Sequence, residues 1–268
     1  MADLTLSQIW VYPIKSLGGM SLQSAKVMSK GLQFDRRWML VDSNGQFLTQ
    51  RVHSKMALFK LSLFEGNLKV DFKGHSILIA TNHKVSGLFD AQVWDDVVSV
   101  FEVSKVHSKW FSEHLGMECR LVQFPEENAR RVDPKYVSNE EHVSLADAYP
   151  FLIIGQSSMD DLNKRMEHPL SIKRFRPNFV FTGGEPYEED SWKNISIGST
   201  QFIGVKRCAR CVLPTVDPET GEKGVEPLRT LSGYRKVDSK VYFGLNLIAT
   251  NHNEIHVGDR IALKTSDT

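Results

Sequence analysis

Two cysteines and three cations lie within six consecutive residues, in the segment Lys206–Cys211 (KRCARC). Positive charge beside a thiol stabilises the thiolate over the neutral form, so at least one of Cys208 and Cys211 is predicted to ionise readily. A thiolate is both a nucleophile and a soft metal ligand. The segment therefore predicts thiol redox chemistry or metal binding.

Three interpretations of this segment compete on its residues alone. A structural zinc site needs four ligands, but there is no second Cys-x-x-Cys, and the nearest histidines, His168 and His252, lack paired spacing. A thioredoxin-type dithiol opens a helix after a strand, whereas Val212–Val216 is predicted to continue as β or extended chain. The third interpretation is two packed small residues beside exposed cations. The choice among them depends on the rest of the chain.

The charge balance of the chain bears on its partners. Lys and Arg total 33 against 32 for Asp and Glu, which gives a net charge of +1. No long-range field therefore attracts nucleic acid or lipid. Isolated basic pairs such as Arg36-Arg37 do not amount to a nucleic-acid-binding face. An anionic ligand would have to be met by a local cluster of cations.

Cysteine usage and the amino terminus bear on location. The three cysteines, at positions 119, 208 and 211, are too few and too unevenly placed for a disulfide framework, which fits a reducing compartment. The amino terminus, MADLTLSQIW, has neither the basic nor the apolar region of a signal peptide. No apolar run approaches the roughly 18 residues of a membrane span. We therefore expect a cytoplasmic protein that does not bind a membrane.

The first hundred residues are predicted to form short strands that position part of the site. Runs of β-branched and aromatic residues alternate there with turn signals, and Asn44-Gly45 and Gly66-Asn67 are each predicted to reverse the chain in a hairpin. The predicted strands are Leu6–Tyr12, Arg37–Val41, Phe47–Arg51, Ala57–Phe64, Leu68–Phe72 and Val98–Val103. Their spacing indicates a curled antiparallel sheet or barrel.

Two helices and a second group of strands are predicted further along the chain. The helices are Val106–Gly116 and Ser157–Met166, the second opening with a Ser-x-x-Asp cap. The later strands are Asn178–Thr182, Gln201–Val205, Leu245–Ala249 and Ile255–Leu263, with a turn at 257–259. The charged, proline-flanked segment Phe124–Ser138 predicts a domain of residues 1–123, a second of residues 124–264 and a tail of residues 265–268.

Several short motifs occur in one order along nearly the whole chain. They are Tyr12–Ser16, Phe34–Trp38, Asp147–Phe151, Phe175–Asn178, Asp190–Trp192, Cys208–Cys211, Thr215–Gly221, Glu226–Leu228 and Phe243–Asn246. Together they resemble the MOSC family with its amino-terminal β-barrel partner domain, above all amidoxime-reducing components and bacterial MOSC proteins that reduce N-hydroxylated bases. The resemblance implies a mainly β fold with some helix (α+β), in which an amino-terminal β-barrel-like domain packs on a MOSC β-barrel domain.

The resemblance also implies a molybdenum cofactor, a molybdenum bound by a pterin, in the cleft between the two domains. Cys211 falls where the metal ligand of the family falls, and soft sulfur suits a redox-active metal. The cofactor ends in a phosphate, which the planar fork of arginine can bind through two hydrogen bonds. The residues expected to bind the cofactor are Lys15, Ser16, Arg36, Arg51, Asp147, Arg176, Asn178, Arg210, Cys211 and Asn246.

Some of these residues also have a purely structural interpretation. Asp147 either accepts hydrogen bonds from the pterin or a water, or caps the helix that follows. Asn178 and Asn246 either bind the pterin edge or satisfy backbone groups. Cys208 is expected to be a packed small residue. The aromatic residues expected in the core or the domain interface are Trp38, Trp94 and Trp192.

The implied activity is an oxygen-atom transfer from a small N-hydroxylated or N-oxide substrate to the reduced metal. Electrons would come from a separate donor protein of ferredoxin, flavodoxin or cytochrome type, because the chain has no cluster-binding cysteine set. The alternative is a carrier that holds the cofactor, or a persulfide on Cys211, for delivery to other enzymes. MOSC domains also occur in cofactor sulfurases, so the fold does not separate these two functions.

Overall fold

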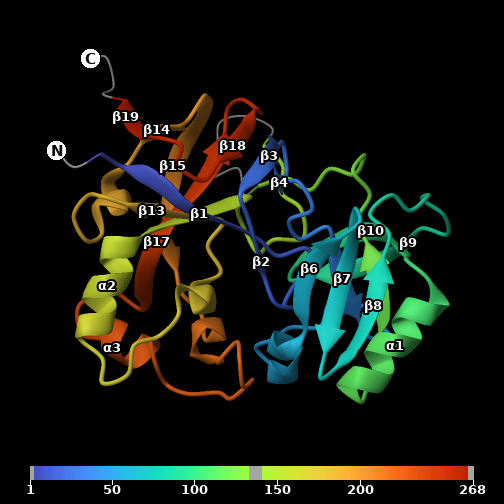
Figure 1. The fold of residues 1–268 in the computed structure, drawn as a ribbon. Coiled ribbons are helices and arrows are strands. Elements are labelled where there is room, and N and C mark those ends of the chain that lie inside the picture. The colour runs from blue at the N-terminus through green and yellow to red at the C-terminus, as the bar shows by residue number, and fades with distance from the viewer. Residues whose placement is uncertain (1–2, 133–140, 265–268) are drawn as a thin grey trace.

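The computed structural model describes residues 3–132 and 141–264, which form two lobes that lie side by side (Figure 1). The larger lobe holds a nine-stranded sheet. Its strands are β1 (Thr5–Val11), β2 (Met20–Leu22), β12 (Phe151–Gly155), β13 (Phe179–Thr182), β14 (Asn194–Ile197), β15 (Thr200–Ala209), β16 (Lys236–Val237), β17 (Lys240–Ala249) and β19 (Ile261–Lys264). Their order is β19-β14-β15-β17-β12-β13-β1-β2, and β16 pairs with β17.

Three smaller sheets complete the strands of the described residues. Their strands are β3 (Ser24–Met28), β4 (Gly31–Leu32), β5 (Trp38–Val41), β6 (Lys60–Phe64), β7 (Asn67–Phe72), β8 (His75–Ile79), β9 (Phe89–Val93), β10 (Asp96–Glu102), β11 (Arg120–Gln123) and β18 (Glu254–His256). The orders are β5-β11-β10-β9, β18-β3-β4 and β6-β7-β8. Strands far outnumber helices, which confirms the predicted mainly β fold with some helix.

Helices are few and short. The α-helices are α1 (Lys105–Leu115), α2 (Gln156–Lys164) and α3 (Leu228–Ser232), and the 3-10 helices are η1 (Ser54–Leu58), η2 (Ile172–Phe175), η3 (Glu188–Ser191) and η4 (Leu213–Thr215). Ser104 is the N-cap of helix α1, and its side chain accepts a hydrogen bond from the His107 backbone N–H. Gly116 is the C-cap and has the left-handed conformation. Both predicted helices are therefore confirmed as α1 and α2, with bounds shifted by one or two residues.

The predicted cap of helix α2 is wrong. The N-cap residue is Gly155, and no side chain of the Ser-x-x-Asp sequence caps the helix. The buried carboxylate of Glu189 instead accepts hydrogen bonds from the Gly155 backbone N–H at 3.1 Å and from the Ser158 hydroxyl at 3.0 Å. A carboxylate from a distant segment thus replaces the local cap.

The chain around residue 50 also departs from the prediction. The turn at Asn44-Gly45 is present, with Gly45 at φ 78° and an antiparallel bridge between Val41 and Phe47. The predicted strand Phe47–Arg51 does not form, because the Thr49 carbonyl accepts hydrogen bonds from Val52 and His53 and turns the chain again. The first part of the predicted strand Ala57–Phe64 is wrong as well, since η1 occupies residues 54–58. Because of this second turn, the side chains of the consecutive residues Gln50 and Arg51 line two different cavities.

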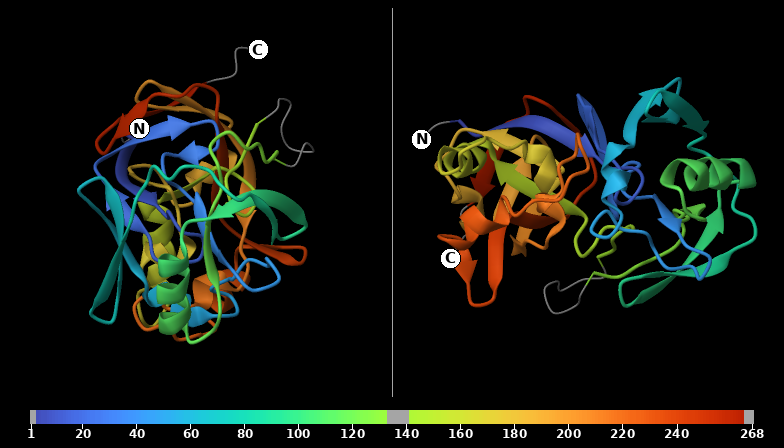
Figure 2. Two further views of the ribbon diagram at one scale, coloured as in Figure 1. Left: turned by 90° about the vertical axis from the view of Figure 1, so that its right-hand side faces the viewer. Right: turned by 90° about the horizontal axis from the view of Figure 1, so that it is seen from below.

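One hydrophobic cluster runs through both lobes. Leu6 and Phe179 of the large sheet share it with Phe59, Leu68 and Phe111 of the smaller lobe. Burial of each such side chain stabilises the fold by about 1.5–3 kcal/mol. Strand β1 pairs with β13, and β3 pairs with β18, so the first residues of the chain join strands from its second half. The two lobes, visible again from below in Figure 2, are therefore joined by a shared hydrophobic core, and the two halves of the sequence are joined by strand pairing.

The predicted division of the chain at residue 123 stays a prediction. Part of the predicted boundary segment, residues 133–138, and the predicted tail, residues 265–268, lie outside the described residues. Within the described ranges, no helix combines the length and the apolar character that crossing a bilayer requires.

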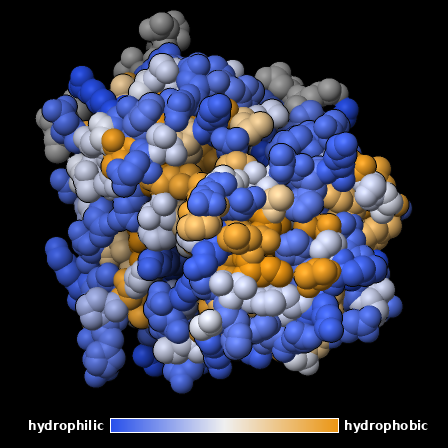
Figure 3. Space-filling model, turned by 45° about the vertical axis from the view of Figure 1, so that its right-hand side comes forward, coloured by the Kyte–Doolittle hydropathy of each residue, from blue (hydrophilic) through white to orange (hydrophobic). Residues whose placement is uncertain are grey.

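The surface of the protein is mainly hydrophilic, with patches of apolar residues on the face drawn in Figure 3. Exposed apolar side chains of the first half of the chain are Val52, Leu63, Phe64, Leu78, Val85, Leu88, Trp94, Val97 and Val106.

Candidate functional site

A cavity of about 390 Å³ is lined by residues from both halves of the chain. Its volume lies in the range of roughly 300–1,000 Å³ typical of small-molecule sites. The cations that line it are Lys15, Arg36, Arg51, Arg176, Lys206, Arg207 and Arg210. Asp147 is the carboxylate among its described lining residues. A chain of net charge +1 thus gathers positive charge around one cavity, which suits an anionic ligand.

Four lining residues other than glycine have left-handed backbone conformations. Ser16 has φ 68°, Arg36 has φ 50°, Trp94 has φ 57° and Arg176 has φ 56°. Such conformations cost free energy and persist only where the surrounding structure imposes them, often at functional sites. Here they occur in the turns that carry these side chains to the cavity wall.

Three neighbouring strands bring residues from distant sequence positions to the same wall. Lys206 of β15 lies opposite Asn246 of β17, and Asn246 lies opposite Leu152 of β12. The pairing of β15 with β17 shifts register on both sides of Lys206 and Arg207. Irregularities of this kind re-aim side chains next to active sites. Beyond them, β15 continues to Ala209, so Cys208 lies in the strand and Cys211 just after it.

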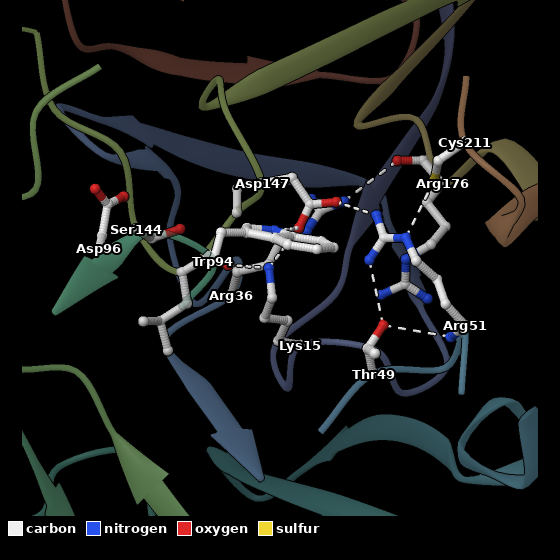
Figure 4. A network of polar contacts seen from close by, with 12 residues as sticks. Lys15, Arg36, Thr49, Arg51, Trp94, Asp96, Ser144, Asp147, Arg176 and Cys211 are labelled. Atoms are coloured by element: carbon white, nitrogen blue, oxygen red, sulfur yellow. Dashed lines mark hydrogen bonds and ion pairs between the residues drawn. The ribbon is translucent and has the colours of Figure 1, made fainter. Parts of the chain in front are cut away.

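Asp147 connects the charged groups at the centre of the cavity (Figure 4). Its carboxylate accepts hydrogen bonds from Lys15 Nζ at 2.5 Å and from Arg51 Nη2 at 2.6 Å. The Trp94 indole N–H donates to it at 3.1 Å, and the Arg51 guanidinium lies 4.7 Å from the Trp94 ring centre. The network therefore joins side chains from four separate segments.

These contacts shift the pKa values of the network. Burial acts to raise the pKa of the Asp147 carboxyl, but Lys15 and Arg51 hold that pKa well below its usual range. Burial lowers the pKa of Lys15 to about 8, although Asp147 acts to raise it. Burial also acts to lower the pKa of Arg51, but Asp147 and then Cys211 raise it overall. Asp147 is therefore ionised at neutral pH, while Lys15 titrates near physiological pH.

Each of the two cysteine sulfurs that line the cavity accepts a hydrogen bond from a guanidinium group. Arg51 Nε donates to Cys211 Sγ at 3.2 Å, and Arg210 Nη1 donates to Cys208 Sγ at 3.1 Å. Cys211 is exposed, whereas Cys208 is half-buried and packs against a hydrophobic cluster. All three cysteines are free. Cys211 is thus the more accessible thiol of the pair.

Behind the cavity, the ring of Tyr12 lies between two arginines. The guanidinium carbons of Arg36 and Arg176 lie 4.4 Å and 4.2 Å from its ring centre. Arg36 forms an ion pair with Asp35 at 2.5 Å, but among the described residues no carboxylate pairs with Arg176. Burial, and next the charge of Arg36, lower the pKa of Arg176 to about 10. An anion beside Arg176 would therefore be stabilised.

All ten residues predicted to bind a cofactor line this one cavity. The side chain of Asn178 also makes hydrogen bonds with backbone groups. Its amide oxygen accepts from the Leu152 N–H, and its amide nitrogen donates to the Trp10 carbonyl. The amide nitrogen of Asn246 likewise donates to the Lys206 carbonyl. The gathering of these residues is a property of the structure, whereas their contact with a cofactor stays a prediction.

Two structural interpretations from the sequence are wrong. Asp147 caps no helix, because it is held by Lys15 and Arg51 in the cavity. The segment Val212–Val216 is not continuously extended, because η4 occupies its centre. This single short turn is not the longer helix that a thioredoxin-type dithiol would open.

The three tryptophans predicted to lie in the core or the domain interface differ in their surroundings. Trp38 and Trp192 are buried, as predicted, whereas Trp94 is 42% exposed and lines the cavity. The prediction placed Trp94 in the core or the domain interface and missed its contact with Arg51. No sequence signal could have found that contact, since it depends on a hairpin meeting a turn about forty residues away. Lys206 and Arg207 also line the cavity and had been noted only as neighbours of the cysteines.

The donor set of the cavity fits the predicted cofactor. No group of three or more His, Cys, Asp or Glu side chains in the described ranges could hold a metal ion, so protein ligands alone do not form a zinc-type site. An exposed thiol and several cations are what a metal bound partly by its own phosphate-bearing ligand requires. The buried Arg210 Nε has no hydrogen-bond partner, so it can serve such a ligand.

Comparisons with known proteins relate the chain to named relatives. Mitochondrial amidoxime-reducing component 1 of Mus musculus is 32% identical over 97% of this chain and 82% of its own length. The human protein of the same name is 30% identical over 97% of this chain. Molybdenum cofactor sulfurase of Arabidopsis thaliana is 32% identical over 89% of this chain, which spans 32% of that protein.

A comparison with solved structures adds a weaker likeness. The YUAD protein of Bacillus subtilis shares 10% identity at a TM-score of 0.41, with 97% of each chain covered, a likeness too low to carry an inference. By contrast, residues 3–118 match the family model of the MOSC N-terminal beta barrel domain, and residues 140–262 match that of the MOSC domain. Together with the identity to amidoxime-reducing components over most of the chain, these matches establish that the chain belongs to the MOSC family.

Proposed function

We propose that the chain binds a molybdenum–pterin cofactor in the large cavity through the Cys211 thiolate and reduces small N-hydroxylated compounds. The observation that carries the proposal is an exposed thiol at a cavity lined by seven cationic side chains. Relatives named as amidoxime-reducing components support the class of substrate.

In this proposal the residues of the chain have distinct roles. Lys15, Arg36 and Arg176 offer the charged donors for a phosphate group, and the unpaired Arg210 Nε offers a further donor. Arg51 donates a hydrogen bond to Cys211 Sγ and so holds in place the sulfur that would bind a soft metal. When bound, the cofactor supplies two-electron redox chemistry.

Asp147 and Trp94 act as positioning residues. Asp147 fixes Lys15 and Arg51 through charge-assisted hydrogen bonds, and Trp94 covers the Arg51 guanidinium. These contacts hold the Arg51 donor on the Cys211 sulfur before any ligand arrives. Preorganisation of this kind reduces the entropy lost on binding.

Reduction of a hydroxylamine to an amine consumes two electrons and two protons and releases water. The proposal therefore requires a separate electron-donor protein of ferredoxin, flavodoxin or cytochrome type. A cytoplasmic location, expected from the amino terminus and the cysteine usage, is part of the same proposal, although the most similar relatives include proteins with mitochondrial names.

Metal content tests the proposal directly. Wild type and Cys211→Ala are purified from a molybdate-fed host and assayed for molybdenum and, after oxidation, for pterin fluorescence, with Cys208→Ala as the matched control. We expect near-stoichiometric metal in wild type and in Cys208→Ala, and loss or altered ligation in Cys211→Ala. Absence of metal and pterin from wild type, even after reconstitution with free cofactor, would contradict the proposal.

A carrier function is the second candidate, and the identity to a plant molybdenum cofactor sulfurase favours it. A carrier would release cofactor, or sulfur from Cys211, to an acceptor enzyme without turnover of its own. The two functions separate in one assay, in which loaded protein receives a chemical reductant and an amidoxime or hydroxylamine. Amine formation supports the reductase, whereas cofactor transfer to an apo-enzyme without amine formation supports the carrier.

A further inference from the structure

Trp94 lies at the tip of a hairpin, in a backbone conformation that disfavours a large side chain. Val93 at the end of β9 pairs with Asp96 at the start of β10, so Trp94 and Asp95 form a two-residue turn. Trp94 has φ 57°, and residues with positive φ in such turns are usually Gly, Asn or Asp. A bulky residue there is an outlier whose strain the surrounding structure must offset. The chain therefore keeps an indole at a position that favours a small residue.

The contacts of the indole use only part of the ring. Its N–H donates to Asp147 at 3.1 Å, and the Arg51 guanidinium lies over the ring, 4.7 Å from its centre. Phe47 packs against it in a T-shaped arrangement at 4.9 Å. These contacts fix the ring beside Asp147 and Arg51 (Figure 4). Trp94 is nevertheless 42% exposed and lines the large cavity, so an oriented aromatic surface is available to a molecule that enters.

The position of the ring relative to Cys211 indicates which molecule meets it. Arg51 contacts both groups, because its Nε donates to Cys211 Sγ at 3.2 Å and its guanidinium lies over the Trp94 ring. A molecule on the Trp94 ring is therefore one side chain away from the proposed metal ligand. Arg36 and Arg176, the proposed donors to the cofactor phosphate, contact Tyr12 instead. Trp94 thus lies near the proposed metal, where a substrate has to bind.

We propose that Trp94 determines substrate specificity by stacking on a planar aromatic ring that carries the N-hydroxylated group. This inference rests on the proposed reductase function and adds a recognition residue to it. Offset stacking of aromatic rings contributes binding energy beyond the burial of apolar surface. A saturated ring of the same size buries a similar apolar surface but cannot stack. Planar substrates are therefore expected to bind about three- to tenfold more tightly than saturated ones.

The test compares benzamidoxime with cyclohexanecarboxamidoxime, which share the amidoxime group and differ in whether the six-membered ring is planar. Binding of each compound to the purified full-length protein is measured by ligand-observed NMR, which needs neither metal nor turnover. Turnover with a chemical reductant is measured separately. We expect wild type to bind benzamidoxime about three- to tenfold more tightly, with a matching difference in KM and a smaller one in kcat.

Three variants assign the preference to Trp94. Trp94→Leu removes the aromatic ring and should abolish the preference by weakening the binding of benzamidoxime, with little change for the saturated analogue. Trp94→Phe keeps an aromatic face and should retain most of the preference. Phe64→Leu removes an exposed aromatic ring that does not line the cavity, and it should change neither affinity. The comparison of the two compounds on wild type keeps the proposal testable if Trp94→Leu does not fold.

Three results would overturn the proposal. Equal affinity of wild type for the two compounds, or no binding of either, would mean that the ring recognises no planar group. Equal weakening of both compounds in Trp94→Leu would limit Trp94 to holding Arg51 in place. Loss of molybdenum or pterin from Trp94→Leu, with both retained in wild type, would assign the ring to the cofactor.

Failure of the proposed reductase function gives a different result. Absence of molybdenum and pterin from wild type contradicts that function, whereas the binding preference is measured without metal. The two failures are therefore distinguishable.

Discussion

Asp147 is the residue on which the charges of the large cavity depend. It accepts hydrogen bonds from Lys15, Arg51 and Trp94, and these donors come from segments about fifty to one hundred and thirty residues away. Lys15 is only 4% exposed, so its ammonium has little water to replace a lost partner. A buried charge without a partner is far more costly than a paired one.

We therefore expect Asp147→Asn to lower the free energy of unfolding by about 1–3 kcal/mol, because it leaves Lys15 and Arg51 without a carboxylate. Urea denaturation measures this change. Asp95→Asn, in the exposed turn between β9 and β10, is the control and should change stability by less than about 0.5 kcal/mol. Equal effects of the two substitutions would mean that the Asp147 network contributes nothing to stability.

Lys15 gives stability a pH dependence whose sign is opposite to that of a typical salt-bridged lysine. Burial lowers the pKa of Lys15 to about 8 in the folded protein, against an ordinary value of 10.5. Between these values the unfolded chain holds the proton that the folded protein has released. Stability therefore rises with pH in this window, since the unfolded state binds more protons.

We expect the stability difference between wild type and Lys15→Met to shift in favour of wild type by about 1–3 kcal/mol from pH 8 to pH 10.5. Denaturation of both proteins across this pH range measures the difference in their free energies of unfolding. The contributions of the other titrating groups are nearly the same in both proteins and cancel in this difference. A difference that stays constant with pH would show that Lys15 titrates at its ordinary value.

At the scale of elements, helix α2 depends on a carboxylate from outside its own sequence. Glu189 is fully buried and accepts hydrogen bonds from the Gly155 N–H and the Ser158 hydroxyl. Burial raises the pKa of Glu189, so its folded form binds a proton more readily than its unfolded form. The contribution of Glu189 to stability therefore decreases as the pH rises from the ordinary glutamate pKa of 4.5 through the higher pKa of Glu189 in the folded protein.

We expect Glu189→Ala to destabilise the protein by about 1–3 kcal/mol, because two donors at the start of α2 lose their acceptor. Glu189→Gln keeps an amide oxygen for the Gly155 N–H and should retain most of the stability while losing the pH dependence. The control is Glu167→Ala, whose side chain is 90% exposed. Thermal or urea denaturation at pH 5 and pH 8 distinguishes the three variants, and a Glu189→Ala protein as stable as the control would exclude the capping role.

At the scale of the whole molecule, the order of strands joins the two halves of the sequence, and a shared hydrophobic cluster joins the two lobes. Strand β1 pairs with β13, β3 pairs with β18, and one hydrophobic cluster includes Leu6, Phe59 and Phe179. Unfolding of the smaller lobe alone would expose part of this shared core to water. The lobes are therefore not expected to unfold independently.

We expect a single unfolding transition, with the same midpoint by tryptophan fluorescence and by far-UV circular dichroism. We also expect a fragment of residues 1–123 to stay unfolded, because β1 would lack β13 and β3 would lack β18. Two separated transitions, or a folded fragment, would instead support the predicted division of the chain at residue 123 as an energetic boundary.

The sequence by itself determined the class of the fold and the chemistry available to the site. Alternating apolar runs and turn residues predicted most of the long strands, and the Ser104 and Gly116 ends of α1 follow from local capping preferences. Nine residues from the motifs, together with Arg51, were predicted to lie in one site, and the structure brings all ten to one cavity wall. These features were predictable because residue type, local conformation and motif order need no knowledge of distant contacts.

Only the tertiary structure decided which groups meet. The contact of Asp147 with Lys15, the stacking of Arg51 on Trp94 and the cap of α2 by Glu189 all join residues far apart in sequence. Local propensity favoured a strand over Phe47–Arg51, yet the chain turns there and sends Gln50 and Arg51 into separate cavities. The physical reason is that hydrogen bonds and charge pairs formed across the fold outweigh local preferences of a few tenths of a kcal/mol per residue.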